Sequence, residues 1–113
     1  MSKYFHVSTG LRGGYMPDNA SVIRCDTRRE LRDYIASEAR DYRDAGFIGA
    51  NKRAVSWLAA IAWREAHKPR PAYLPHCMEL APSHAPRNYC NGIFVSVASR
   101  ADWLEYQAEC EDY

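Results

Sequence analysis

The sequence lacks long hydrophobic runs and carries little net charge. No stretch approaches 18 apolar residues free of charge, so we expect no transmembrane helix and no membrane partner. The first residues, Met-Ser-Lys-Tyr-Phe-His, contain no apolar run of the kind found in a signal peptide, so we expect a cytoplasmic protein. The net charge is +1, which provides no overall field to attract nucleic acid.

Cysteine pairs of the Cys-x-x-Cys type are also missing. The four cysteines lie far apart, at Cys25, Cys77, Cys90 and Cys110. Without an export signal they are most simply reduced thiols. Four potential zinc ligands fall within residues 76–90, namely His76, Cys77, His84 and Cys90. Their spacing matches no standard zinc pattern, and adjacent His and Cys ligands suit tetrahedral geometry poorly, so we expect no metal and no cofactor.

Lysine is scarce, with 3 Lys against 12 Arg. The planar guanidinium group suits carboxylates, phosphates and aromatic faces. Basic residues gather at the starts of two expected helices, as Arg28, Arg29 and Arg32 and as Lys52 and Arg53. These residues define one alternative, a nucleic-acid-binding module. The acidic residues Asp26, Glu30 and Asp33, interspersed in the first group, argue instead for an ordinary mixed-charge surface.

The most distinctive stretch is an alanine-rich apolar segment at residues 54–67. Alanine favours helix because it loses no side-chain entropy there. At 100° per residue one face is apolar, with Val55, Leu58, Ala62 and Ala66. The opposite stripe is narrow and more polar, with Arg53, Ser56, Ala60, Arg64 and His67. A helix with so thin a polar stripe is expected to be wrapped by the rest of the domain.

The remaining pattern predicts a single α+β domain over residues 1–113. Alternating segments predict strands at 3–8 and 21–25, paired antiparallel, and at 93–98. Capping boxes predict helix starts at Thr27 with Glu30 and at Ser99 with Asp102. Five prolines predict a long ordered loop over 69–92. We therefore expect about three antiparallel strands packed with three helices, in the order β-β-α-α-loop-β-α.

His6 and Ser8 place an imidazole and a hydroxyl on the same face of the first strand. This pattern is used by phosphoesterases with two His-x-Ser/Thr motifs and by ADP-ribosyltransferases. A second His-x-Ser/Thr motif is missing, and no glutamate follows the late strand before Glu105. A small enzyme using His6 and Ser8 is therefore an alternative, against a half-buried structural histidine.

Two segments, Tyr4-Phe-His-Val-Ser-Thr-Gly-Leu-Arg-Gly-Gly-Tyr-Met-Pro-Asp18 and Asp26-Thr-Arg-Arg-Glu-Leu31, carry a resemblance. They resemble small accessory proteins encoded by tailed bacteriophages and prophages, as do Asn51-Lys-Arg-Ala-Val55 and Gly92-Ile-Phe-Val-Ser96. The resemblance implies a phage protein made in the host cytoplasm that binds and inhibits or modulates a host or defence protein. An anti-CRISPR-like inhibitor, which acts without catalysis, is one example.

We expect such a partner to bind two loops that present aromatic and guanidinium groups. The residues concerned are Arg12, Tyr15, Tyr73, Arg87 and Tyr89. Tyrosine, tryptophan and arginine dominate the energetics of protein interfaces, and proline restricts the backbone of the second loop. The other candidate surface is the acidic last helix with Asp102, Glu105 and Glu109, which would suit a basic partner surface through mimicry of nucleic acid.

Overall fold

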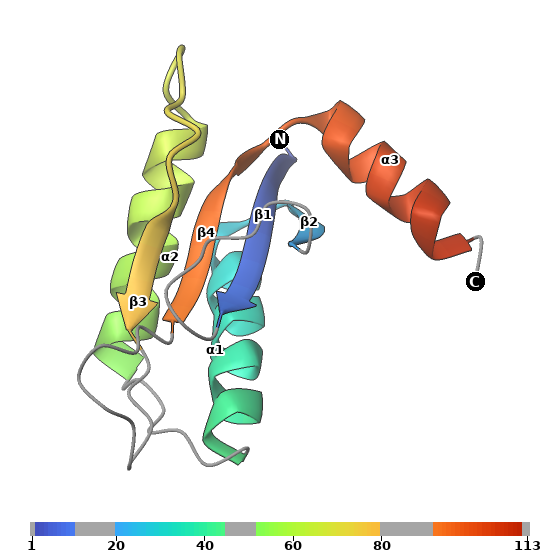
Figure 1. Ribbon diagram of the computed structural model, residues 1–113. Helices are drawn as coiled ribbons and strands as arrows, with labels where there is room; N and C mark the ends of the chain where they lie inside the picture. Colours follow the sequence, from blue (N-terminus) through green and yellow to red (C-terminus); the bar gives the residue numbers. More distant parts are fainter. Residues whose placement is uncertain (1, 11–19, 45–51, 80–91, 112–113) are drawn as a thin grey trace.

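A computed structural model describes residues 2–10, 20–44, 52–79 and 92–111. Its elements are β1 (Lys3–Gly10), β2 (Ser21–Cys25), α1 (Arg28–Asp44), α2 (Lys52–Ala66), β3 (His76–Glu79), β4 (Gly92–Ala98) and α3 (Arg100–Glu111). The strands form one antiparallel sheet in the order β2-β1-β4-β3, with α1 and α2 against one face (Figure 1). The predicted α+β class is confirmed, and so is the antiparallel pairing of the first two strands.

The centre of the fold is the pair of strands β1 and β4. Phe5 lies opposite Ile23 on β2 and Val97 on β4, so these three side chains share the face that packs on the helices. Phe5 is completely buried, as is Val95 on the same face. The whole of β4 is buried on both faces, which fits its apolar sequence and its place between two strands.

The strand β3 lies within the segment that the prolines predicted to be a loop. That prediction is wrong for His76–Glu79, which pairs antiparallel with β4 from His76 opposite Val95 to Glu79 opposite Gly92. Proline removes a backbone donor, but none occurs between Pro75 and Pro82. The interval is long enough for a short edge strand, and pairing with β4 satisfies backbone groups that local sequence cannot satisfy alone.

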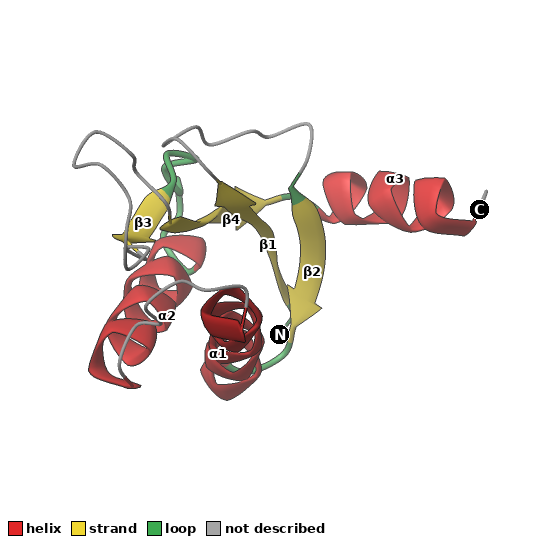
Figure 2. Ribbon diagram, turned by 60° about the horizontal axis from the view of Figure 1, so that its bottom comes forward, coloured by secondary structure: helices red, strands yellow, loops and turns green. Residues whose placement is uncertain are grey.

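The predicted apolar face of α2 is confirmed, since Val55, Leu58, Ala59, Ala62 and Ala66 are buried. Arg53, Ser56, Arg64 and His67 of the predicted polar stripe are exposed, and so is Trp57. Among the described elements, α1 and the sheet contact α2 (Figure 2). Small alanine side chains let a helix look uniformly apolar without the need for burial on every side.

The predicted capping box forms in full at Ser99 and Asp102, and at Thr27 and Glu30 one of its two backbone bonds forms. Thr27 Oγ1 accepts a hydrogen bond from the Glu30 backbone N–H at 3.2 Å at the start of α1. At the start of α3 the exchange is reciprocal: the Ser99 N–H donates to Asp102 Oδ2 and the Asp102 N–H donates to Ser99 Oγ, each at 3.0 Å. These bonds satisfy backbone donors that lack a partner inside the helix.

The last helix, α3, projects away from the body beside β2 (Figures 1 and 2). Its first turns are held by Trp103, whose ring centroid lies 5.7 Å from that of Tyr4 and 5.9 Å from the Arg24 guanidinium carbon. Tyr106 adds a hydrogen bond from its hydroxyl to Ser21 Oγ at 3.4 Å. Within the described residues, α3 is therefore attached by one side.

Candidate functional site

Most of the predicted partner-binding residues lie outside the described part of the chain. These are Arg12, Tyr15, Arg87 and Tyr89. The fifth, Tyr73, is described and is 60% exposed, next to Leu74 at 74%. Two large exposed side chains side by side make a small apolar projection on the connection between α2 and β3. The prediction for the two loops as a binding surface remains a prediction.

The turn that carries Tyr73 is fixed by Glu65, a buried carboxylate near the end of α2. Its Oε1 accepts the Ala72 backbone N–H and its Oε2 accepts Lys68 Nζ, both at 2.7 Å. The hydrogen bond from Lys68, followed by the one from Ala72, lowers the pKa of Glu65 below its ordinary value. Glu65 thereby ties a segment seven residues further along the chain back onto the helix end.

A groove between α1 and α2 brings together most of the basic residues singled out in the sequence. It has a volume of about 560 Å³ and is lined by Arg28, Arg29, Arg32, Arg53, Ser56, Trp57, Ala59 and Ala60. Lys52 is exposed but does not line it. Three arginines come from the start of α1, and the fourth comes from the outer side of α2. We call this surface the arginine groove.

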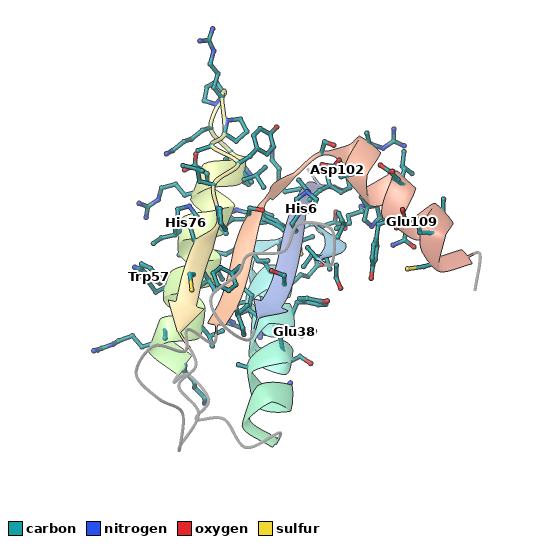
Figure 3. All side chains as sticks on the ribbon, in the orientation of Figure 1. His6, Glu38, Trp57, His76, Asp102 and Glu109 are labelled. Carbon is teal, nitrogen blue, oxygen red and sulfur yellow. The ribbon has the colours of Figure 1, made fainter. Side chains whose placement is uncertain are left out.

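Trp57 was not singled out from the sequence as a site residue, because a tryptophan in an apolar helix is ordinarily part of the core. The structure instead leaves it 53% exposed on the outer side of α2 (Figure 3). Trp63 takes the core role, with its ring stacked 6.0 Å from that of Phe5. The sequence offered one signal: at 100° per residue, Trp57 lies farther than Trp63 from the centre of the apolar face of α2.

The arginine groove carries positive charge that the described residues do not neutralise. Arg32 pairs with its neighbour Asp33, with 3.3 Å between Nη2 and Oδ1. For Arg28, Arg29 and Arg53, the described part of the chain provides no ion pair. Positive charges at a helix N-terminus oppose the helix dipole, so the arrangement gives nothing to the stability of α1. Guanidinium groups that share one surface in this way are well placed to bind an anion.

His6 and Ser8 share the face of β1 that is turned away from α1 and α2, as their spacing predicted. His6 Nε2 lies 3.4 Å from Asp102 Oδ2 at the start of α3 (Figure 3). His6 Nδ1 and Ser8 Oγ are buried, and neither forms a hydrogen bond within the described residues. Cross-strand neighbours of His6 are Val22 on β2 and Ser96 on β4.

A carboxylate beside an imidazole is an arrangement that orients a general base. Here, however, the Asp102 carboxylate also caps α3. The hydrogen bond from the Ser99 N–H is the main cause that lowers the pKa of Asp102, with a further contribution from His6. Ser8 is only 7% exposed, which leaves its hydroxyl little access to a substrate. The contact between His6 and Asp102 joins β1 to the first turn of α3.

The four candidate zinc ligands are not brought together by what the structure describes. His76 and Cys77 are neighbours on β3 and so point to opposite faces of the sheet, while His84 and Cys90 lie outside the described residues. Across the described ranges no three His, Cys, Asp or Glu side chains gather as a metal site. No described helix has the length and apolar character needed to cross a membrane.

Comparison of the chain with protein-family models, with curated proteins and with solved structures found no match.

Proposed function

We propose that the protein is a non-catalytic binding protein that holds an acidic segment of a host or defence protein in the arginine groove. The observation that carries the proposal is the gathering of four arginines around an exposed tryptophan on α1 and α2. Arginine and tryptophan are the residue types most enriched among energetic hot spots of protein interfaces. The phage context implied by the sequence resemblance supports a host or defence protein as the partner.

The chemistry of the arginine groove fits a carboxylate-bearing peptide. Each guanidinium group can donate two parallel hydrogen bonds to one carboxylate. The alanines Ala59 and Ala60 and the indole of Trp57 offer an apolar floor and wall for a neighbouring apolar side chain. In an acidic segment with one apolar residue, the carboxylates would therefore pair with the arginines, and the apolar side chain would pack on Trp57 and the alanines.

Single-stranded nucleic acid is the second candidate, because a base could stack on Trp57 while arginines contact phosphates. The net charge favours protein, because a value of only +1 provides no overall field that would hold a phosphate backbone.

Capture from a nuclease-treated bacterial lysate tests the proposal. Wild-type protein should retain a stoichiometric protein partner, and Trp57→Ala and Arg53→Ala should each reduce its affinity at least tenfold, about 1.4 kcal/mol. Arg70→Ala is the matched control, since it removes an exposed arginine outside the groove. The same variants are titrated against a labelled oligothymidine.

Binding of oligothymidine that depends on Trp57 and Arg53, with no captured protein, would replace the proposal with the nucleic-acid candidate. A partner that is retained by both groove variants would move the interface elsewhere, with the loops around Arg12 and Tyr73 as the next surfaces to examine. The phage inference carries a separate requirement, namely that the captured partner is a host or defence component.

A further inference from the structure

The outward side of α3 has no partner within the described part of the molecule. Trp103 and Tyr106 turn towards the sheet, and at 100° per residue the opposite side of the helix is fixed. That side carries Ala101, Leu104, Glu105, Ala108 and Glu109. Leu104 is 47% exposed, and none of the described side chains from 100 to 110 is buried. We call this surface the α3 stripe.

The helix α3 has 12 residues, and its described contacts come from one side. Isolated helices of this length are marginal in water, and most of their stability in proteins comes from packing an amphipathic face. The apolar and acidic residues of the α3 stripe gain nothing from the contacts made by Trp103 and Tyr106. Burial of Leu104, which is 47% exposed, against another surface would add to the stability of the helix.

The α3 stripe and the arginine groove are complementary in chemistry. The stripe presents Glu105 and Glu109 one turn apart, with Leu104 and Ala108 beside them. The groove presents four arginines beside an exposed tryptophan and two alanines. Carboxylates can pair with guanidinium groups while the leucine packs on the indole, so both sets of groups find partners in one contact.

Within one copy the two surfaces cannot meet. The groove is formed by α1 and α2, which cover one face of the sheet, whereas α3 leaves the body beside β2 and extends away from both helices (Figures 1 and 2). The anchors at Tyr4 and Ser21 hold the first turns of α3 at that edge. Figure 3 shows Trp57 and Glu109 on opposite sides of the molecule.

We infer that the α3 stripe of one copy docks into the arginine groove of a second copy, so that the protein associates with itself. Charge complementarity identifies α3 as the occupant of the groove, because the groove is basic and α3 presents carboxylates on its exposed side. Each copy offers both surfaces, so two copies can exchange helices to form a closed pair, or successive copies can join head to tail.

This inference extends the proposed function without depending on the identity of the partner. A docked α3 would occupy the surface proposed for the acidic partner segment, so self-association would compete with partner binding. In this competition, α3 of a second copy takes the place of the acidic segment of the partner. Partner capture and self-association are measured separately, and either can fail while the other holds.

Sedimentation equilibrium over a range of protein concentrations tests the inference. Wild-type protein should show species at twice the 12.9 kDa mass of one chain or above, and their population should fall with added salt. Glu105→Arg combined with Glu109→Arg should weaken association at least tenfold, and so should Arg29→Glu combined with Arg53→Glu. Arg70→Glu changes an exposed arginine outside the groove and should leave association intact.

Mixing the two double variants separates a lost contact from a lost fold. The chain with reversed α3 charges keeps an intact groove, and the chain with reversed groove charges keeps an intact α3. Each should sediment as a monomer alone, and the mixture should form a complex. A wild-type chain that stays monomeric at every concentration up to about 1 mM, a weak-affinity limit, would overturn the inference. So would association that survives both double variants.

Discussion

Replacing Leu58 by alanine should be among the most destabilising single changes in this protein. Leu58 is completely buried on the face of α2 that meets the sheet, within the main apolar cluster. Removal of a buried leucine loses its transfer free energy and leaves a cavity, at a cost of about 2–5 kcal/mol. For a domain near this size each kcal/mol lowers the melting temperature by about 4 °C, so the variant should melt about 8–20 °C lower.

The assay is urea unfolding followed by circular dichroism, with Arg64→Ala as the matched variant. Arg64 lies on the exposed stripe of the same helix, so its loss should cost less than about 1 kcal/mol. A domain of this kind has a total stability of about 5–15 kcal/mol, so the Leu58 variant should remain folded enough to measure. Equal losses at the two positions would refute the assignment of the buried face of α2.

Two further predictions concern titratable groups. Burial, followed by the charges of Glu30 and Asp26, raises the pKa of the Cys25 thiol to about 12, whereas Cys77 and Cys110 are exposed. In native protein a thiol reagent should therefore modify Cys25 only at the rate of unfolding, and rapid modification would contradict its burial. The lowered pKa of Asp102 means that its stabilisation is present above the ordinary value of 3.8 and is lost as pH falls through the lowered one. Asp102→Asn should thus be less stable than wild type at about pH 7, and the difference should shrink towards pH 3. A constant difference across that range would assign the effect to packing.

Local pattern was sufficient for the elements whose signals lie within a few residues. Alternation of side chains predicted the strand 21–25 with the bounds observed for β2, and the capping pairs at Thr27 and Ser99 predicted where α1 and α3 begin. The spacing of apolar residues also predicted which face of α2 is buried. Each of these depends on short-range sterics and hydrogen bonds, which are the same whatever the rest of the chain does.

The edge strand β3 could not be found in this way, because its signal is not local. Four residues between prolines become a strand only when β4 offers unpaired backbone groups beside them. The sequence also predicted that the domain wraps α2. Alanine is compatible with both burial and exposure, so an alanine-rich pattern does not determine how much of the helix is covered. Whether Trp57 lies in the core or in a groove depends on how many elements surround α2.

The candidate site shows the same division. The sequence identified Arg28, Arg29, Arg32 and Arg53 as basic residues near two helix starts and placed His6 and Ser8 on one strand face. Only the packing of α1 against α2 brought the arginines into one groove with Trp57, and only the path of α3 brought Asp102 to His6. Residues distant in sequence meet through tertiary packing, because the free energy that fixes their separation comes from burial across the whole core rather than from either segment alone.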